Sequence, residues 1–440
     1  MVRKHQIVDG RWEMGDRRWG IGVISRCSNL RTPICYLYLL ICYLLSPICL
    51  YGYSSLDSYW NIGEPVRGLS ARSLSMGGAA IASVNDSLSL LSNPALMKLA
   101  DGQKGLANVS TGLVLFFDKR NHSYLSTDYV TTDNMYFQMP SASILWSASK
   151  RNDVVFGFGF FSDLNFDYNF EEKDTSLGTT DKIEKDGGFH NWALGMNWIM
   201  ADWVSMGFTY LWGRGESQTD YTYIKPKPDG KYDITKTSDC QTLNGDSFVF
   251  GSNFSYEDKF NFGLTFRSNF DMTVKDKNWG VGVSTGTELV YEMPYLLGFG
   301  ASYNFKDGND SKITFDAIFS NWGDSKYWKT KFNGIKQPKE KENPLYKNVW
   351  EYHLGFEHSP TQKTTLRYGF SYLPDYPNPS EALPSVSFGL GIIVGRAIVD
   401  IASEYAWRQS SQKRISQTLT GFDDVAESRL KLLSTVGYKW

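Results

Sequence analysis

Hydrophobic and polar residues alternate with a period of two along most of the chain after Gly105. This alternation predicts β-strands with one face in an apolar environment and the other in a polar one. In the stretch Ser385–Val394, every second residue from Val386 onward is hydrophobic, opposite serines and glycines. The pattern predicts about fourteen strands, an even number as bacterial barrels require: Gly105–Phe117, Phe137–Ser149, Val154–Phe166, Gly188–Met200, Val204–Gln218, Thr242–Tyr256, Phe260–Met272, Glu288–Phe305, Lys312–Trp322, Val349–Ser359, Thr364–Tyr372, Ser385–Val394, Ile398–Arg408 and Arg429–Trp440.

The connections between these strands are of two kinds that alternate strictly. Short polar turns lie at 150–153, 201–203, 257–259, 306–311, 360–363 and 395–397. Long hydrophilic connections lie at 118–136, 167–187, 219–241, 273–287, 323–348, 373–384 and 409–428. Short periplasmic turns and longer extracellular loops are typical of transmembrane β-barrels. The fold class we predict is therefore all-β, a transmembrane antiparallel β-barrel over residues 105–440.

Charged residues within the predicted strands should face the lumen, because a charge on the lipid face costs about 2–4 kcal/mol at the bilayer midplane. We expect this of Arg267, Asp316, Arg367, Asp400 and Glu404. A proton or ion relay is one reading of these residues. A solvated or salt-bridged lumen wall that holds a plug is the simpler one.

The segment Ala71–Leu99 differs from everything that follows it, since it is rich in small residues and nearly uncharged. Gly77 and Gly78, beside several alanines, permit tight turns and close packing. The segment ends on Asn93-Pro94-Ala95, where the proline interrupts any helix. We expect residues 55–104 to form a small plug, or hatch, inside the lumen of the barrel.

The apolar run Ile34–Leu50, about 17 residues, lies at the short limit for a membrane-spanning helix. Basic residues precede it and small residues follow it, which is the order of a cleavable secretory signal. We therefore assign residues 1–54 to a signal peptide whose upstream extension indicates a true start further along the chain. An uncleaved anchor is the alternative.

The amino-acid composition reduces the number of functions that the chain could have. The chain is 15% aromatic with a net charge of −2 and a mean hydropathy of −0.34, a mixture that suits a barrel with aromatic girdles and a polar lumen. A basic stripe for nucleic acid is absent from the sequence. Four of the five cysteines lie in the first 50 residues and the five histidines are scattered, so neither a disulfide scaffold nor a metal site is indicated.

The stretch from Ala71 to Ala95 resembles the N-terminal hatch of the FadL/TodX-type (OMPP1) long-chain fatty-acid transporters of the outer membrane. In that family an Asn-Pro-Ala motif lies in the plug, and the resemblance implies this place for Gly77, Gly78, Asn93, Pro94 and Ala95. Leu96 departs from the pattern, because a glycine often follows the motif. Pro294–Gly300 and Leu366–Phe370 resemble strands of the family, so the match covers the plug and much of the C-terminal half.

The resemblance also implies a kinked strand that opens the wall sideways. The third predicted strand carries the candidates for this opening and for ligand contacts, Phe156, Gly157, Phe158, Gly159, Phe160 and Phe161. Ser162-Asp163 could host the same break, and an ordinary lipid-facing row of phenylalanines is the plainer interpretation. At the other end of the chain, Tyr438 and Trp440 resemble the assembly signal read by the outer-membrane insertion machinery.

The function expected from this resemblance is passive uptake of hydrophobic molecules, long-chain fatty acids first among them, by a monomer in the outer-membrane lipid. No cofactor is implied. We do not expect an enzyme, since His353 lacks an activated nucleophile beside it. The alternative is a non-transporting surface barrel, such as an adhesin, an antigen or a platform for exported proteins. A hydrophilic porin is disfavoured because a plug would obstruct it.

Overall fold

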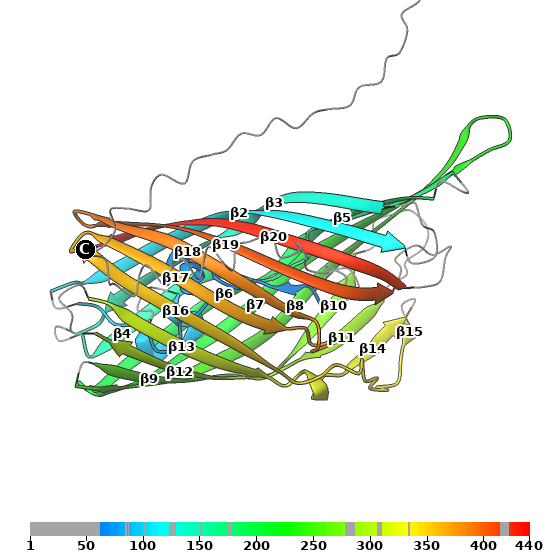
Figure 1. The fold of residues 1–440 in the computed structure, drawn as a ribbon. Coiled ribbons are helices and arrows are strands. Elements are labelled where there is room, and N and C mark those ends of the chain that lie inside the picture. Colours follow the sequence, from blue (N-terminus) through cyan, green and yellow to red (C-terminus); the bar gives the residue numbers. More distant parts are fainter. Residues whose placement is uncertain are drawn as a thin grey trace, which may run out of the picture. The chain divides into compact units, whose positions relative to one another are not determined.

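A closed antiparallel barrel forms in the computed structural model, which describes residues 62–83, 86, 88–100, 102–122, 129–149, 152–174, 178–257, 259–277, 287–305, 310–332, 335–413 and 422–440. Fourteen wall strands follow one another in the described part of the chain, and the last pairs with the first to close the ring (Figure 1). The predicted fold class and strand number are thus confirmed. The predicted signal peptide, residues 1–54, lies outside the described residues.

Each wall strand pairs antiparallel with its neighbours, and four of them are bent into two labelled pieces. The wall consists of β2 (Gly105–His122), β3 (Tyr129–Ser147), β4 (Val154–Asn165) with β5 (Tyr168–Asp174), β6 (Thr179–Ala201), β7 (Val204–Pro226), β8 (Tyr232–Tyr256), β9 (Phe260–Arg267) with β10 (Phe270–Asp276), β11 (Glu288–Met293) with β12 (Leu296–Asn304), β13 (Lys312–Ser320) with β14 (Tyr327–Phe332), β16 (Val349–Thr361), β17 (Thr364–Pro374), β18 (Ala382–Val394), β19 (Ala397–Lys413) and β20 (Phe422–Lys439). The short strands β1 (Glu64–Pro65) and β15 (Ile335–Lys336) and the 3-10 helix η2 (Trp322–Asp324) complete the wall and its loops.

Several strands are longer than the alternation predicted. Most of the expected loop 219–241 belongs to the paired strands β7 and β8, and this hairpin projects beyond the neighbouring strands (Figure 1). Beyond the membrane both faces of a strand meet water, so threonine, tyrosine and charged residues replace the hydrophobic alternation. The predicted strand Glu288–Phe305 is bent at Pro294–Tyr295, because proline cannot donate to the ladder.

Large hydrophobic side chains point outward from the wall. They belong to every second residue of a strand, as the alternation requires. In β20, Leu432, Val436 and Tyr438 are exposed on one face while Lys431 and Leu433 are buried on the other. Trp440 follows on the exposed side, and its backbone exchanges hydrogen bonds with Gly105 (3.2 Å each way), which ties the C-terminus to the first wall strand.

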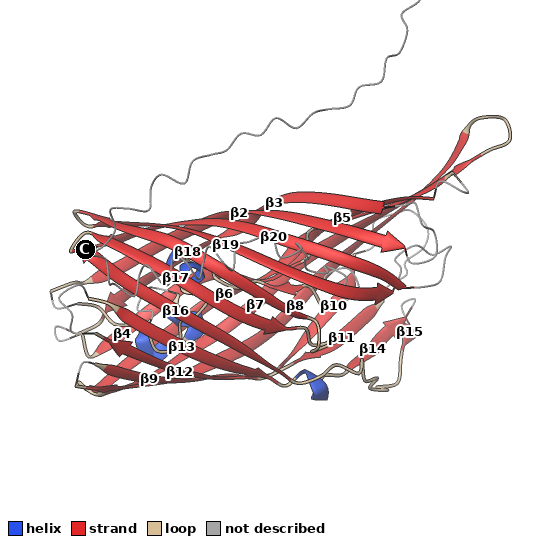
Figure 2. Ribbon diagram, viewed as in Figure 1, coloured by secondary structure: helices blue, strands red, loops and turns tan. Residues whose placement is uncertain are grey.

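Three short helices fold inside the ring of strands (Figure 2). Helix α3 (Ala71–Ser75) contacts β17–β20, whereas α4 (Ser89–Ser92) and the 3-10 helix η1 (Pro94–Leu96) contact the opposite arc formed by β6 and its neighbours. Ser70 caps α3, since its side chain accepts a hydrogen bond from the N–H of Ser73. No helix among the described residues is long and apolar enough to cross a membrane.

Candidate functional site

Asn93 fastens the plug to the wall. Its side chain is fully buried, at 0% exposure. The Nδ2 group donates to the carbonyl oxygens of Ile81 in the plug (2.8 Å) and Ser252 in β8 (3.1 Å). Its Oδ1 accepts from the N–H of Ala95 (3.1 Å) and so caps η1, whose first residue is Pro94. The Asn93-Pro94-Ala95 motif therefore joins two parts of the plug to the barrel.

Glycine in the wall makes room for this motif. A Cβ atom on Gly251 of β8 would lie 2.0 Å from Asn93 Oδ1, and one on Gly207 of β7 would lie 2.3 Å from the carbonyl carbon of Pro94. Non-bonded atoms do not approach this closely, so the motif fits only where the wall has no side chain. The backbone of the plug rests directly on the backbone of the barrel.

The Gly77-Gly78 pair contacts the opposite arc of the wall. Both residues have positive φ (68° and 86°), the left-handed region that favours glycine. His353 of β16 is buried, and its Nδ1 donates to the carbonyl oxygen of Gly77 at 2.6 Å. A Cβ on Gly369 of β17 would lie 1.9 Å from the N atom of Gly77. These contacts explain why small residues fill this part of the sequence.

Three of the predicted lumen charges, Asp316, Arg367 and Asp400, contact the plug or join strands of the wall around it. Asp316 of β13 is fully buried, and its Oδ2 accepts from the backbone N–H groups of Ala80 (2.6 Å) and Ile81 (2.8 Å). Arg367 of β17 forms ion pairs with Glu357 (2.7 Å) and Asp400 (2.6 Å). The carboxylate of Asp316 thus stabilises a plug turn, and Arg367 joins three wall strands.

The other two lumen charges lie nearer an irregularity of the wall. Arg267 of β9 forms a two-pronged ion pair with Asp163 of β4, with N–O distances of 2.9 and 2.5 Å. Asn191 of β6 also donates to Asp163 (2.9 Å). Glu404 of β19 contacts Arg429 of β20 at 3.3 Å. Bidentate charged contacts of this kind hold a side chain in one geometry.

The pairing of β3 with β4 stops partway along the wall. The register runs from Ser147↔Val155 to Ala142↔Phe160 and is not continued beyond this point in the described residues. Asp163 forms a β-bulge against β6, between Ser162 and Leu164. On the other side of the opening, β3 contains Pro140, which cannot donate to a ladder. The wall therefore opens between β3 and β4.

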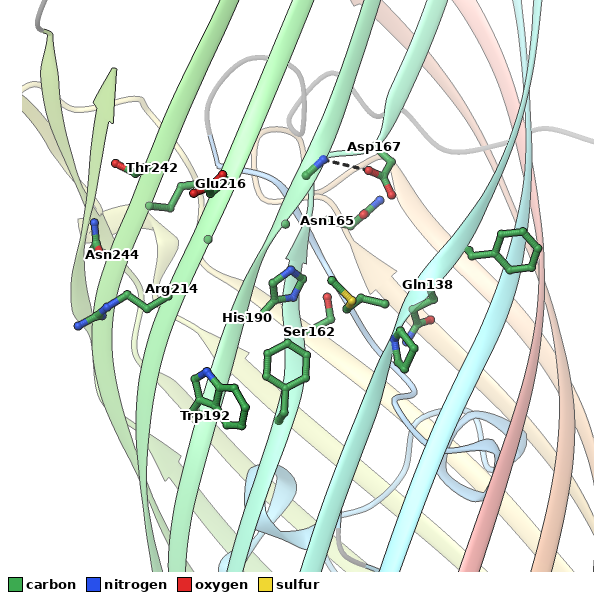
Figure 3. A pocket seen from close by; sticks show the side chains of 18 of the residues that line it. Gln138, Ser162, Asn165, Asp167, His190, Trp192, Arg214, Glu216, Thr242 and Asn244 are labelled. Carbon is green, nitrogen blue, oxygen red and sulfur yellow. Dashed lines mark hydrogen bonds between the residues drawn. The ribbon is translucent and has the colours of Figure 1, made fainter. Parts of the chain in front are cut away.

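The outer side of this opening is a groove of 890 Å³. Its apolar lining includes Phe137, Met139 and Pro140 of β3 with Phe160 and Trp192 across the opening. Its polar lining comes from β3, β4, β6, β7, β8 and the bend between β4 and β5 (Figure 3): Gln138, Ser162, Asn165, Asp167, His190, Arg214, Glu216, Thr242 and Asn244. An elongated molecule with an apolar body and a polar end fits such a lining.

The phenylalanine-rich stretch of β4 lies beside this groove. Phe158 is exposed on the outer face, and Phe156 and Phe160 are partly exposed on the same face, where Phe160 lines the groove. Phe161 is buried in the lumen instead. Gly157 and Gly159 pair with strands on both sides, so the expectation of a break at either glycine is wrong. The bulge at Ser162-Asp163 is the site of the irregularity.

The inner side of the opening is covered by the segment Ile62–Arg67, which we call the strap. Its residues Glu64 and Pro65 pair with Asn165 and Leu164 of β4, and the N–H of Val66 donates to the carbonyl oxygen of Asp163 at 2.8 Å. Pro65 lies at the non-hydrogen-bonded position of this ladder, where its missing N–H costs nothing. The strap replaces β3 as the partner of β4.

Ionic contacts hold the strap in this place. Glu64 forms an ion pair with Arg429 of β20, and Arg67 forms a bidentate pair with Glu351 of β16. Lys431 of β20 donates to the carbonyl oxygen of Arg67 at 2.6 Å. A cavity of 30 Å³ separates the strap from β3 and β4 and shares four lining residues with the outer groove: Gln138, Met139, Ser162 and Asn165.

Apolar side chains form a cluster in the lumen, on the side of the plug that faces the long connections. Ile62 of the strap and Leu164 and Phe166 at the end of β4 belong to it. Further members come from six other elements and from the connection after β17: Phe189, Leu243, Met272, Val274, Tyr291, Met293, Trp322, Val349 and Tyr376. Trp322 and Tyr376 stack with their ring centroids 4.1 Å apart. The strap therefore lies between an apolar lumen and an apolar groove on the outer surface.

The sequence-based candidates included Ser162-Asp163 and Phe160 but neither Pro140 nor the residues that hold the strap. Pro140 was absorbed into a predicted strand, although a proline inside a strand pattern is the available signal for an unpaired edge. Glu64, Arg67, Arg429 and Lys431 carry no local signal, because their contacts join residues more than 280 positions apart along the chain.

A closed barrel with a lumenal plug and an opening in its wall belongs to the class of outer-membrane transport barrels. The sequence profile described as outer membrane protein transport protein (OMPP1/FadL/TodX) matches residues 64–386, more than half of the chain. The chain belongs to this family.

Solved structures share the fold at low sequence identity. A Pseudomonas aeruginosa FadL homologue is 14% identical, with 86% of this chain and 99% of that chain covered and a TM-score of 0.63. The Pseudomonas putida toluene transporter TodX is 14% identical over 86% of this chain and 99% of that chain, with a TM-score of 0.56. The CymD monoaromatic hydrocarbon channel is 14% identical over 85% and 99%, with a TM-score of 0.55. A comparison with curated proteins finds no match.

Proposed function

We propose that the protein takes up hydrophobic molecules passively, long-chain fatty acids first among them, and releases them sideways into the membrane between β3 and β4. The observation that carries this proposal is the interrupted pairing of β3 and β4, with an apolar cluster on its inner side and an 890 Å³ groove on its outer side. The strap pairs with β4 between the two and lines the small cavity behind the opening. No energy source or cofactor is required.

The sideways route keeps an alkyl chain in apolar surroundings. Each methylene exposed to water costs about 0.8 kcal/mol. A path through the part of the lumen that holds the plug would therefore be unfavourable for a long alkyl chain. This part of the lumen contains the charged contacts of the plug with the wall, such as Arg72 with Glu357 at 3.2 Å. The route through the opening passes from the apolar cluster to the groove and then to lipid.

The size class of the substrate stays open within this proposal. TodX and TbuX are named as toluene transporters, and CymD is named as a monoaromatic hydrocarbon channel. A panel of ligands from toluene to long-chain fatty acids, measured for competition with a fluorescent fatty acid, distinguishes these classes. Fatty acids that compete while toluene does not would support the longer substrate.

A disulfide that locks the strap tests the route. Pro65 and Leu164 are a non-hydrogen-bonded pair, whose Cα atoms lie about 4.5 Å apart in antiparallel ladders, within the range of a disulfide. In a Cys240→Ser background, Pro65→Cys with Leu164→Cys should abolish uptake of radiolabelled oleate under oxidising conditions and restore it under reduction. Cells without their own fatty-acid channel provide the assay.

The two single-cysteine variants are the controls, because each carries one of the two substitutions and cannot form the crosslink. Uptake that is equal in the oxidised and reduced double variant would contradict the sideways route. Equal uptake in cells with and without the protein would contradict transport itself.

The non-transporting surface barrel is a second candidate, favoured by the projecting hairpin of β7 and β8. Tyr232 and Ile234 near its tip are exposed, at 63% and 55%. Removal of residues 220–239 should abolish binding of an extracellular partner if this candidate is correct, and should leave oleate uptake unchanged if transport is the function. We also propose that residues 55–104 act as the plug, that the chain works as a monomer, and that Tyr438 and Trp440 serve the insertion machinery.

A further inference from the structure

The projecting hairpin of β7 and β8 has one free sheet edge. On the β7 side, β6 pairs with the hairpin almost to its tip. On the β8 side, β10 pairs only as far as Gln241, and one further hydrogen bond joins the N–H of Lys277 to the carbonyl oxygen of Cys240. Within the described chain, nothing pairs with this edge of β8 over residues 232–239, and all of these residues are exposed.

The ladder inside the hairpin determines which backbone groups face this edge. The N–H of Lys227 donates to the carbonyl oxygen of Lys231 at 2.7 Å, so the odd-numbered residues of β8 exchange hydrogen bonds with β7. The N–H and C=O groups of the even-numbered residues point the other way, as they do at Cys240. Four N–H and four C=O groups on this edge therefore lack a partner among the described residues: those of Tyr232, Ile234, Lys236 and Ser238.

Most of the devices that protect a sheet edge are missing here. Natural edge strands are kept from pairing by prolines, bulges, charged side chains or short length. No proline lies between residues 232 and 239, and the pairing of β7 with β8 runs without a bulge. Lys236 is the one basic side chain in this range. The edge is therefore a template for a further strand.

The edge is complementary to itself. A two-fold axis perpendicular to the sheet leaves every side chain on its own face, so two copies pair antiparallel with odd residues opposite odd ones. When Thr235 lies opposite Thr235 of a second copy, Lys231 lies opposite Asp239, twice by symmetry. Threonine pairs and opposite charges stabilise antiparallel ladders. The two neighbouring registers either set Lys236 against itself or bring no opposite charges together.

The same register satisfies the free backbone groups. Tyr232 lies opposite Ser238 of the second copy and Ile234 lies opposite Lys236, so symmetry gives four pairs of even-numbered residues. Their N–H and C=O groups face the partner, and each such pair exchanges both hydrogen bonds. All of the groups that the hairpin leaves unpaired on this edge are then bonded.

Antiparallel pairing also fixes how the two barrels stand. Strand β7 has 23 residues, of which about 9–11 span a membrane. The remaining residues, about 12, extend about 40 Å, and the hairpin projects away from the barrel (Figure 1). Because the tips of two paired hairpins point in opposite directions, their barrels lie in two facing membranes and not side by side in one.

We infer that the free edge of β8 binds the same edge of a second copy in a facing outer membrane, so that the protein links two membranes by homotypic strand pairing. This activity is separate from uptake, because the hairpin lies outside the lumen and each barrel closes by itself. Each channel remains a monomer in its own membrane.

A cysteine on the two-fold axis tests the pairing. Full-length protein with Cys240→Ser and Thr235→Cys is reconstituted into two vesicle populations that carry different affinity tags. Residue 235 takes a non-hydrogen-bonded position, where Cα atoms lie about 4.5 Å apart, within the range of a disulfide. Oxidation after mixing should give covalent dimers that contain both tags.

Thr237→Cys in the same background is the matched control. It keeps every other cysteine, the residue type, the strand and the exposure. In the proposed register residue 237 lies opposite Asp233 and about 14 Å from its own counterpart, so it should not form the disulfide.

Charge exchange tests the register. Lys231→Glu and Asp239→Lys each place two pairs of like charges across the contact, and each should slow the clustering of vesicles about tenfold. Mixing vesicles of one variant with vesicles of the other restores both opposite pairs, and clustering should return to the wild-type rate. Ile234→Pro removes an N–H from the free edge but none from the β7 ladder, and it should abolish clustering, whereas Ile234→Ala should not.

Several outcomes would overturn the inference. They are clustering of wild-type vesicles no faster than that of protein-free vesicles, equal crosslinking at residues 235 and 237, and dimers that carry a single tag only. Mixed charge variants that cluster as slowly as either variant alone would contradict the register and the pairing with it. Heat-modified migration on a gel shows that each variant is folded.

Discussion

Replacing Asn93 with alanine removes three hydrogen bonds from a side chain that has 0% exposure. Each neutral hydrogen bond contributes about 0.5–1.5 kcal/mol net, and a buried group left without a partner costs about 1–3 kcal/mol. The substitution leaves the carbonyl oxygen of Ile81 and the N–H of Ala95 without this partner. We therefore expect the plug to lose about 3 kcal/mol of its free energy of local unfolding.

The barrel should survive this change, because strand pairing does not depend on Asn93. Hydrogen–deuterium exchange measures local unfolding directly, and about 3 kcal/mol corresponds to a rise of more than a hundredfold in the exchange of plug amides between residues 71 and 99. Exchange in β16–β20 should stay unchanged. Heat-modified migration on a gel checks that the barrel is folded.

Ser92→Ala is the control for this prediction. The hydroxyl of Ser92 is buried beside Asn93 but has no hydrogen-bond partner among the described residues, so its loss should change exchange by less than about threefold, or about 0.7 kcal/mol. Asn93→Asp keeps the acceptor for Ala95 but turns a carboxylate oxygen toward two carbonyl oxygens, and it should loosen the plug at least as much as alanine does. Plug exchange in Asn93→Ala within threefold of wild type would refute the reasoning.

Gly251→Ala should destabilise the plug by about 1–3 kcal/mol, the usual cost of overpacking, because its Cβ would lie 2.0 Å from Asn93 Oδ1; plug exchange should rise, whereas the outward neighbour substitution Ser252→Ala should have little effect. Burial raises the pKa of Asp86 above its ordinary value, against the opposing effect of Arg72. A raised pKa makes the Asp86 contribution to stability complete below about pH 3.9 and smaller as pH rises. Asp86→Asn should therefore slow plug exchange at pH 7, with a difference from wild type that shrinks toward pH 4; a difference that grows as pH falls would contradict this sign.

The wall of the barrel could be predicted from the sequence because lipid imposes the pattern. Every second residue of a spanning strand must be apolar, so strands such as Ser385–Val394 are visible without any partner. The same reasoning failed beyond the membrane, where β7 and β8 continue through residues assigned to a loop. Water on both faces removes the alternation while the ladder of hydrogen bonds remains.

The opening could be predicted only in part. The family resemblance implied an opening near the third strand, with Gly157, Gly159 and Ser162-Asp163 as candidates, yet Gly157 and Gly159 are fully paired. The bulge at Asp163 and the gap in the pairing of β3 with β4 depend on partners distant in sequence. Arg267 holds Asp163, and Glu64 contacts Arg429, 365 positions away. No spacing rule connects such residues. Besides the candidate Ser162-Asp163, Pro140 carries a local signal, since proline cannot donate to a ladder within a strand.

The contacts of plug and strap differ in a way that decides which one moves first. The plug rests on wall glycines with its backbone, and Asn93, His353 and Asp316 tie it to three different strands. Shifting it would break these bonds together and leave buried polar groups unpaired. The end of the strap is held by a two-residue ladder, one backbone hydrogen bond, one ion pair and the packing of Ile62 in the apolar cluster. Because local opening follows the smallest set of contacts, we expect the strap to open before the plug does, as the proposed release through the wall requires.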